Sequence, residues 1–343
     1  MLKNKIHILL IKLTHWEFWP TKVVYFPVFV YAIFIALCRR NLFFFSNVNP
    51  NIEAGGLFGA SKNKQLEYLP QQFKPKTMFV SSGTNTKDLI ARFKDSGISY
   101  LAIAKPDRLE RGVGVNVIKT EQELTAYHQR IAADYVIQEF IKYEFEAGVF
   151  FFRYHLNDNG IINSLVLKDF LSVTGDGEHS VAQLLKEKNR GLLVYEKLSK
   201  QLEDTMLSIP AKGEKIILEP IGNHNRGTMF INGNALINKN LVTAFTEIAN
   251  HLPEFYYGRF DIKAPSQADF LAGKNIKVLE VNGVNAEPAH IYDPKFPLLK
   301  AWRVLLYHWS VISKISALNK KRGHHYITLG ETKQLFRNRK ISS

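Results

Sequence analysis

Two apolar segments decide the fold of this chain: YYGRFDIK at residues 256–263 and KVLEVNG at residues 277–283. Each segment carries two polar side chains two positions apart. The pairs are Arg259 with Asp261, and Glu280 with Asn282. Alternate residues of a β-strand point to one face, so each pair shares a face. The stretch 264–276 between the segments contains proline and glycine and predicts a loop, so we expect two antiparallel neighbouring strands.

On such a hairpin the oxygen-bearing side chains converge. Asp261, Glu280 and Asn282 offer hard oxygen ligands, which suit Mg²⁺ bound partly through nucleotide phosphates. Arg259 stands beside them and is suited to stabilise negative charge. The alternative interpretation is a hairpin whose polar side chains face water. The apolar neighbours of these residues favour a ligand site.

Two upstream stretches carry further candidates. In residues 99–118 a predicted strand ends at Lys105, and a loop with Arg111, Gly112 and Gly114 follows. A lysine at a strand end reaches phosphate as a point charge, and glycines let backbone N–H groups approach phosphate oxygens. A surface hairpin that contains a lysine is the alternative.

The stretch YVIQEFIKYEFEAGV at 135–149 contains a predicted strand that runs into Glu139, with Glu146 seven residues later. Backbone groups near Glu139, Phe140 and Ile141 are placed to pair with an adenine edge, and a carboxylate to hold ribose hydroxyls. A solvated linker with two carboxylates is the alternative.

Strands and helices alternate along the middle of the chain. We predict strands at 77–80, 99–104, 115–118, 135–140 and 147–154, and helices at 61–72, 86–95 and 121–133, the last capped by Thr120. This alternation predicts an α/β or α+β fold. The 343 residues, 46% hydrophobic, suffice for two or three packed lobes.

The formal net charge is +14, and Cys38 is the only cysteine, so no internal disulfide forms. The charge has three interpretations: nucleic-acid binding, contact with an anionic membrane surface, or a basic surface with an anion site. No helix-turn-helix, zinc-finger or RNA-binding signature is present, so we do not expect a nucleic-acid partner.

In order and relative position, these motifs resemble the ATP-grasp enzymes, in particular the D-alanine–D-alanine ligase branch and the ligase domain of cyanophycin synthetase. The resemblance covers roughly Lys62 to Pro294. It implies an ATP-grasp fold that holds ATP between two α+β lobes, after an N-terminal apolar helical segment. It also implies two Mg²⁺ ions, with Mn²⁺ as an alternative.

The resemblance assigns roles residue by residue. Asp261, Glu280 and Asn282 would hold the metal, and Arg259 would stabilise an acyl-phosphate and a tetrahedral adduct. The nucleotide would contact Lys62, Lys105, Arg111, Gly112, Gly114, Glu139, Phe140, Ile141 and Glu146. Three residues are candidates for phosphate or substrate contact: Lys168, which precedes a GDG turn, and Asn225 and Arg226.

The sequence also departs from that family. After Asn282 it continues GVNAEPAHIYDP, where the D-alanine ligases have a Pro-Gly turn that lines the dipeptide site. About 60 residues precede Lys62 in place of the usual substrate lobe. The substrates therefore cannot be inferred from either relative.

The N-terminal part contains an uncharged run at 23–38, VVYFPVFVYAIFIALC. At about 1.5 Å per residue it is shorter than a hydrocarbon core of about 30 Å. Two interpretations stay open: a monotopic anchor in the cytoplasmic leaflet, helped by Trp16 and Trp19, or a helix buried against the first lobe. ATP chemistry implies a cytoplasmic location.

We therefore expect four parts: an apolar N-terminal segment with the loop after it (1–60), a lid and central lobe (61–142), a catalytic lobe (143–316) and a flexible basic tail (317–343). The function expected is an ATP- and Mg²⁺-dependent ligase that joins a carboxylate to an amine through an acyl-phosphate. The alternatives are a small-molecule kinase on the same scaffold, and a non-catalytic nucleotide-binding module at a membrane.

Overall fold

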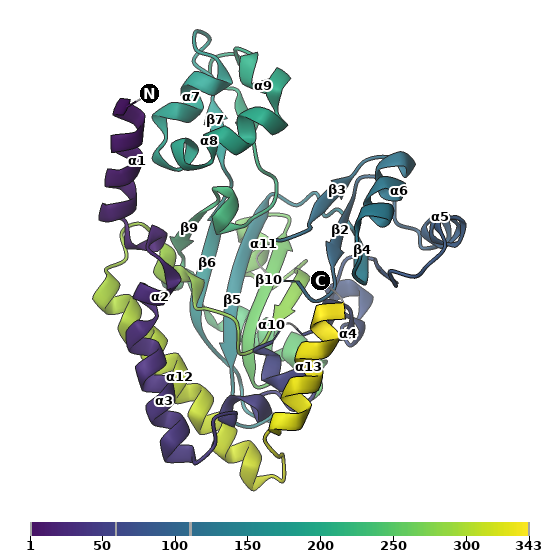
Figure 1. Cartoon of the computed structure of the whole chain (residues 1–343), viewed down its shortest axis with the longest axis vertical. Helices are drawn as coiled ribbons and strands as arrows, with labels where there is room; N and C mark the ends of the chain where they lie inside the picture. The colour runs from purple at the N-terminus through teal and green to yellow at the C-terminus, as the bar shows by residue number, and fades with distance from the viewer. Residues whose placement is uncertain (1, 59, 110–111, 342–343) are drawn as a thin grey trace.

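The computed structural model describes residues 2–58, 60–109 and 112–341. Its β-strands form three antiparallel sheets: a five-stranded sheet in the order β11-β10-β5-β6-β9, a four-stranded sheet in the order β1-β4-β2-β3, and the pair β7-β8 (Figure 1). The expected α+β architecture with a cleft between two lobes is confirmed.

The strands are β1 Thr77–Val80, β2 Ala102–Pro106, β3 Asn116–Ile118, β4 Tyr135–Glu139, β5 Phe145–Phe152, β6 Ile161–Asp169, β7 Ser172–Thr174, β8 Lys215–Ile217, β9 Met229–Asn232, β10 Tyr257–Ala264 and β11 Lys277–Asn282. The helices are α1 Leu2–Thr14, α2 Thr21–Val24, α3 Phe26–Arg39, α4 Lys62–Glu67, α5 Thr86–Asp95, α6 Glu121–Arg130, α7 Val181–Glu187, α8 Asn189–Gln201, α9 Glu203–Leu207, α10 Lys239–Asn250, α11 Gln267–Leu271, α12 Leu298–Lys321 and α13 Leu329–Ile341. Short 3₁₀ turns lie at Trp16–Phe18, Phe44–Asn47, Glu53–Gly56, Gln71–Phe73, His224–Arg226, Asn234–Leu236 and Ala289–Tyr292.

The predicted antiparallel pairing of β10 and β11 is confirmed. Arg259 pairs with Asn282 and Asp261 with Glu280, and the register shifts after Asp261. The connection differs from the expected plain loop. It contains α11, because Ser266 caps the helix by accepting a hydrogen bond from the Asp269 N–H.

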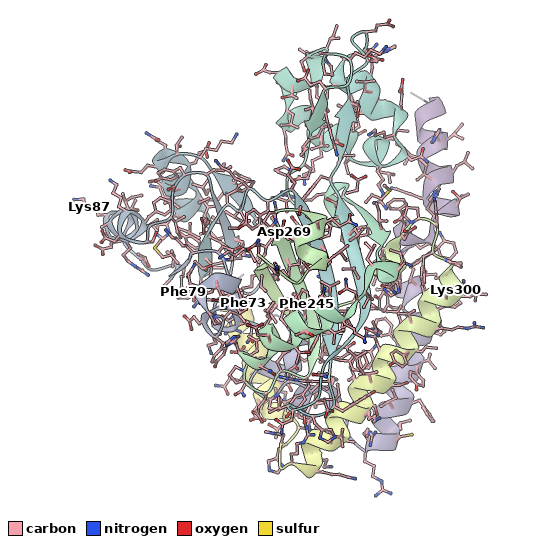
Figure 2. All side chains as sticks on the ribbon, turned by 180° about the vertical axis from the view of Figure 1, so that it is seen from behind. Phe73, Phe79, Lys87, Phe245, Asp269 and Lys300 are labelled. Carbon is pink, nitrogen blue, oxygen red and sulfur yellow. The ribbon has the colours of Figure 1, made fainter. Side chains whose placement is uncertain are left out.

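The main hydrophobic core lies between the five-stranded sheet and α10. Phe245 of α10 packs at 5.5 Å from the ring of Phe260 on β10, and both side chains are fully buried. Figure 2, seen from behind, places Phe245 against the central sheet. One face of β10 therefore belongs to this core, and the alternate residues point to the other face.

The four-stranded sheet has its own core with α5 and α6. Both helices begin at capping residues: Asn85 accepts from the Lys87 N–H at 2.8 Å, and Thr120 accepts from the Glu123 N–H at 3.2 Å. The predicted Thr120 cap is thus confirmed, while α6 ends at Arg130 rather than at 133.

The N-terminal segment packs along the long C-terminal helix α12. Its helix α3 lies side by side with α12 (Figure 1). Tyr31 on α3 bonds Ser310 at 2.8 Å, and Arg39 donates to Ser313 at 2.9 Å. Within the described part of the chain, no helix is both long and apolar enough to cross a membrane.

The loop after α3 inserts between α12 and the back of the five-stranded sheet. The Asn49 side chain donates to the Tyr257 carbonyl at 2.8 Å and accepts from the N–H groups of Tyr256 and Tyr257. Gly55 and Gly56 have φ values of +66° and +88°, and a Cβ on Gly56 would lie 2.7 Å from the Cα of Gly283. Only glycine allows this close approach beside the end of β11.

The structure divides the chain at other positions than expected in two places. Residues of β7, β8 and α7–α9 form a separate small core, which the pattern did not separate from the catalytic lobe. The expected boundary at 316/317 falls inside α12, and the expected flexible tail contains α13. The Thr328 hydroxyl accepts from the Glu331 N–H and so caps α13.

Candidate functional site

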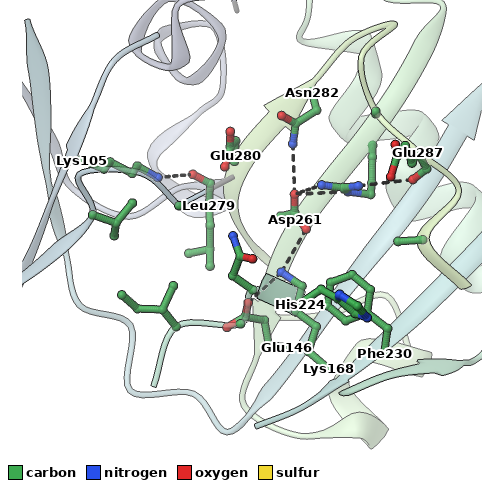
Figure 3. Close-up of a pocket in the computed structure, with 18 of the residues that line it drawn as sticks. Lys105, Glu146, Lys168, His224, Phe230, Asp261, Leu279, Glu280, Asn282 and Glu287 are labelled. Carbon is green, nitrogen blue, oxygen red and sulfur yellow. Dashed lines mark hydrogen bonds and ion pairs between the residues drawn. The ribbon is translucent and has the colours of Figure 1, made fainter. Parts of the chain in front are cut away.

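A cavity of about 400 Å³ lies between the two larger sheets and is closed at one end by the N-terminal segment. It collects most of the candidates from the sequence (Figure 3). Those that line it are Lys62, Lys105, Gly112, Glu139, Phe140, Ile141, Glu146, Lys168, Arg259, Asp261, Glu280 and Asn282.

Other candidates are not brought to the cavity. Gly114 lies outside its lining, where its φ of +71° and a Cβ contact of 2.7 Å to the Pro106 ring explain the need for glycine, and its expected phosphate contact stays a prediction. Arg226 also lies outside the lining and pairs with Glu219 at 3.3 Å. The neighbours Asn223 and His224 line the cavity instead. Arg111 and the side chain of Asn225 lie outside what the structure describes.

Asp261 is the centre of the charged cluster on β10. Its Oδ2 accepts from Arg259 Nη2 at 3.0 Å and from Asn282 Nδ2 at 3.0 Å, and its Oδ1 lies 3.0 Å from Lys168 Nζ. Burial alone would raise the pKa of Asp261, but Arg259 and Lys168 outweigh it and lower the pKa to about 2. Asp261 is therefore ionised at neutral pH.

The row of charges continues across β5 and β6. Lys168 Nζ lies 2.9 Å from Glu146 Oε1, and Lys263 Nζ lies 3.9 Å from Glu146 Oε2. Burial would lower the pKa of Lys168, but Asp261 and Glu146 outweigh it and raise the pKa. Lys168 thus links the two buried carboxylates, whereas the expected contact of Glu146 with ribose stays a prediction.

Gly148 makes room for this cluster. It lies opposite Asp261 on β5, and a Cβ there would lie 2.8 Å from a methyl group of Val166, 3.3 Å from Arg259 Cδ and 3.4 Å from Asp261 Oδ1. A side chain at this position would therefore push on the carboxylate. The residue is the glycine of the EAGV sequence in the stretch 135–149, which is expected to border the nucleotide.

Two lysines approach the cluster from the other side of the cleft. Lys105 on β2 donates to Gln138 Oε1 at 3.1 Å and to the Leu279 carbonyl at 3.0 Å. Burial lowers its pKa to about 8 despite the opposing effect of Glu280. Lys62 Nζ lies 3.6 Å from Glu280 Oε1. The strand-end lysine thus points toward β11, as Figure 3 shows.

Lys263 connects the cluster to the segment between β4 and β5. The sequence interpretation did not include this residue. Its Nζ donates to the carbonyls of Ile141 at 3.2 Å and Tyr143 at 3.1 Å. The Glu139 N–H donates to the Lys76 carbonyl. The sequence did contain a pattern that could have identified Lys263: it follows Arg259 and Asp261 at a spacing of two along β10 and so lies on the same face of the strand.

The far end of the cavity is aromatic, and the sequence interpretation missed it too. Trp16 and His224 each lie 5.6 Å from the ring of Tyr292, and Trp16 donates to the Phe296 carbonyl. Trp16 is therefore part of the cavity wall, and its expected role in a membrane contact stays a prediction. Glu17 forms an ion pair with Arg190 and a hydrogen bond with His224. As the only Asp or Glu among residues 1–52, Glu17 was the one local signal.

A carboxylate also lies on the aromatic side of Arg259. Glu287 Oε2 accepts from the Tyr292 hydroxyl at 2.7 Å, and its carbonyl accepts from Arg259 Nη1 at 3.3 Å. Burial, with a further contribution from Glu287, raises the pKa of Tyr25 well above its usual value. The Tyr25 phenol therefore remains protonated near this carboxylate.

Neither a search of protein families nor a search of curated proteins finds a match. Among solved structures, the chain is similar to the D-alanine–D-alanine ligase of Bacillus anthracis complexed with ATP (14% identity, TM-score 0.43, 82% of this chain and 71% of that one). It is also similar to the VanG D-Ala:D-Ser ligase of Enterococcus faecalis (12% identity, TM-score 0.42, 75% and 64%).

A third similar structure is the bifunctional glutathione synthetase of Pasteurella multocida (17% identity, TM-score 0.39, 71% of this chain and 35% of that one). Because this chain spans about a third of the bifunctional enzyme and every TM-score is below 0.5, these likenesses decide neither substrate nor reaction.

The donor set of an ATP-grasp metal site can be tested on the side chains present. No group of three or more His, Cys, Asp and Glu side chains within the described residues is placed to hold a metal ion. The set on β10 and β11 instead combines two carboxylates at paired register positions with the amide oxygen of Asn282. These hard oxygen donors fit Mg²⁺. Both Asp261 oxygens are engaged here, so a metal would compete with Lys168 or Arg259.

Several cationic side chains stand beside the carboxylates of the cluster. Around Asp261, Glu280 and Glu146 stand five cationic side chains: Lys62, Lys105, Lys168, Lys263 and Arg259. These ammonium and guanidinium groups, gathered in a partly buried cleft, are suited to contact the oxygens of a polyphosphate.

Proposed function

We propose that this protein is an ATP- and Mg²⁺-dependent ligase that joins a carboxylate to an amine through an acyl-phosphate. The observation that carries the proposal is the shared face of β10 and β11. There Asp261, Glu280 and Asn282 stand beside Arg259, with Lys105 opposite. Carboxylates for a metal, a guanidinium for an oxyanion and lysines for phosphates are the groups that acyl-phosphate chemistry requires.

Asp261, Glu280 and Asn282 are the proposed holders of Mg²⁺, which when bound neutralises phosphate charge. Two ions are expected, with Mn²⁺ as an alternative. Lys62 and Lys105 bind phosphate oxygens, and backbone groups of residues 139–141 border the adenine. Arg259 binds the oxygen that becomes negative in each transition state. Positioning of this kind supplies most of the catalytic effect in phosphoryl transfer.

The proposed reaction has two steps. A substrate carboxylate oxygen attacks the γ-phosphorus, the bond from phosphorus to the ADP oxygen breaks, and an acyl-phosphate remains. An amine nitrogen then attacks the acyl carbon, the bond from carbon to the phosphate oxygen breaks, and a proton leaves the nitrogen. The products are an amide, ADP and phosphate.

We assign the amine to the aromatic end of the cavity. Glu287 offers a carboxylate there, next to Arg259, and the rings of Trp16, Tyr25 and Tyr292 lie around it. An ammonium group pairs with a carboxylate and is attracted to aromatic faces, and the carboxylate is placed to accept its proton. The Glu287→Gln variant should raise KM for the amine at least tenfold and leave KM for ATP unchanged.

The test is an ADP-release assay with the purified chain, Mg²⁺ and a matrix of amino acids, peptides, sugar acids and amines. The ligase proposal expects ADP release that needs both a carboxylate and an amine. ADP release without an amine would favour a kinase. Tight Mg·ATP binding without turnover across the matrix would favour a non-catalytic module.

Two variants separate site from scaffold in this assay. Asp261→Asn and Glu280→Gln should abolish turnover while the circular-dichroism spectrum stays unchanged. Glu247→Gln is the matched control, since Glu247 is an exposed carboxylate on α10. ADP release retained in either site variant would contradict the metal assignment. We propose that the ligase acts in the cytoplasm, where ATP and Mg²⁺ are available, in contact with an anionic membrane surface.

A further inference from the structure

The helix α3 exposes an apolar stripe. Its large exposed side chains recur at helical spacing along one face: Phe26, Phe29, Val30, Ile33, Phe34 and Leu37. Leu37 is 68% and Phe26 is 67% exposed, whereas Val28 and Ile35 on the opposite face are buried. A surface helix of a soluble protein normally turns its apolar stripe inward. Here one apolar face meets the core and a second meets solvent.

The helix α1 repeats this pattern. Its exposed apolar side chains stand at i, i+3, i+4 and i+7: Ile6, Leu9, Leu10 and Leu13. Of the 24 large apolar side chains that are exposed among the described residues, 13 lie between Ile6 and Leu42. Single exposed apolar residues are normal, but a concentration of this kind marks a surface that another phase or molecule covers.

The charges around these stripes have one sign. Lys12, Lys22 and Arg40 are exposed. The only acidic side chain of residues 1–52, Glu17, is turned inward, 3% exposed and paired with Arg190. The neighbouring helix α12 contains no acidic residue, and Lys300 projects from its outer side in Figure 2. An apolar surface with a basic border is complementary to anionic lipid head groups.

The length of α3 is too short for the helix to cross a membrane, but it suits a helix that lies in the plane of the membrane surface. The 14 residues of α3 give about 21 Å of helix, less than a hydrocarbon core of about 30 Å. The other side of α3 packs against α12, where Arg39 donates to the Ser313 hydroxyl at 2.9 Å. In Figure 1, α1 and α3 follow one edge of the molecule. The exposed apolar side chains of α1 from Ile6 onward and those of α3 are thus available for contact.

We propose that the membrane-docking face, formed by the exposed apolar side chains of α1 and α3 with Lys12, Lys22 and Arg40, lies in the interface of an anionic lipid bilayer. The apolar side chains enter the boundary between head groups and acyl chains, and the cations contact lipid phosphates and carboxylates. A second copy of the chain fits this face less well, because a two-fold contact would bring the same cations together.

The membrane-docking face adjoins the cavity. Trp19, which lies between α1 and α3 in the chain and is 36% exposed, lines the cavity, as does Thr21. Docking therefore places this wall of the cavity beside the lipid surface. Substrates held at the membrane would reach the cavity without crossing bulk solvent.

Vesicle flotation with the full chain tests the proposal and needs neither nucleotide nor turnover. The wild type should float with vesicles of 70% phosphatidylcholine and 30% phosphatidylserine at least tenfold more than with phosphatidylcholine alone. The triple variant Phe29→Gln, Ile33→Gln and Leu37→Gln should lose at least tenfold of that binding. Because these side chains are exposed, its circular dichroism and thermal midpoint should match the wild type.

The matched control replaces two exposed apolar side chains elsewhere, Leu207→Gln with Ile209→Gln, and should bind vesicles as the wild type does. Lys22→Gln with Arg40→Gln should reduce the preference for anionic vesicles several-fold. A wild type that stays unbound, or a triple variant that floats as the wild type does, overturns the proposal. So does a wild-type dimer in light scattering that the triple variant abolishes without any vesicle binding, since the face would then join two copies.

Discussion

Replacing Lys168 by methionine removes the cation that links two buried carboxylates. Lys168 Nζ lies 2.9 Å from Glu146 and 3.0 Å from Asp261, and the three side chains are 8%, 6% and 10% exposed. Breaking a buried ion pair by removing one partner costs about 3–5 kcal/mol. Asp261 retains Arg259 and Asn282, whereas Glu146 retains an ion pair with Lys263 at 3.9 Å. We therefore expect a loss near the lower limit, about 3 kcal/mol at pH 7.

The loss should depend on pH. In the wild type, Arg259 and Lys168 lower the pKa of Asp261 to about 2, so the stabilisation that Lys168 gives this carboxylate is present at pH 7 and is lost as the pH falls from about 4 toward 2. Urea unfolding of wild type and variant at pH 7 and at about pH 2.5 measures the difference in the free energy of unfolding, which should be smaller at the lower pH.

The control is Lys200→Met, which removes an exposed lysine on α8 and should change the free energy of unfolding by less than about 0.5 kcal/mol. A Lys168→Met loss below about 1 kcal/mol at pH 7, or one that is equal at both pH values, would refute the assignment of Lys168 as the link between these carboxylates.

Three further predictions concern packing and protons. Gly148→Ala should lower turnover at least tenfold and stability by about 1–3 kcal/mol, because its Cβ would press on the cluster, while Gly83→Ala, with nothing within 4 Å, should be neutral; urea curves and ADP release check both. With the pKa of Lys105 at about 8, ATP binding at pH 8 should take up about half a proton, and the affinity for ATP should fall at most about tenfold per pH unit above 8. Calorimetry in two buffers measures the proton uptake, and Lys105→Met should abolish this uptake. Burial lowers the pKa of His290 to about 4 and of His308 to about 3, so the unfolded chain binds more protons than the folded chain below pH 6.5. The free energy of unfolding should therefore fall by about 1.4 kcal/mol per pH unit for each histidine as the pH drops from 6.5 toward 4. His308→Gln should reduce this slope in urea titrations, and an unchanged slope would contradict the neutral state of His308.

The part of the site that the sequence predicted lies on local periodic structure. The period of two along β10 and β11 places Arg259 with Asp261 and Glu280 with Asn282, and the apolar neighbours set which face is buried. Capping residues such as Thr120 marked helix starts for the same reason, because the cap bonds lie within four residues.

The parts that the sequence did not predict depend on contacts between distant segments. Trp16 meets Tyr292 across 276 positions, and no local pattern carries that contact. Lys168 could be marked as basic, but its place between Glu146 and Asp261 follows from the strand order β10-β5-β6. The sequence also did not predict which face of α3 would be exposed, since an apolar run does not indicate which side faces the core.

The most direct test of the central claim is calorimetric binding of ATP with and without Mg²⁺. The account predicts Mg²⁺-dependent binding by the wild type and by Glu247→Gln, and a loss of the Mg²⁺ dependence by at least tenfold in Asp261→Asn and Glu280→Gln. A wild type that does not bind ATP, or site variants that bind Mg·ATP as the wild type does, would contradict it.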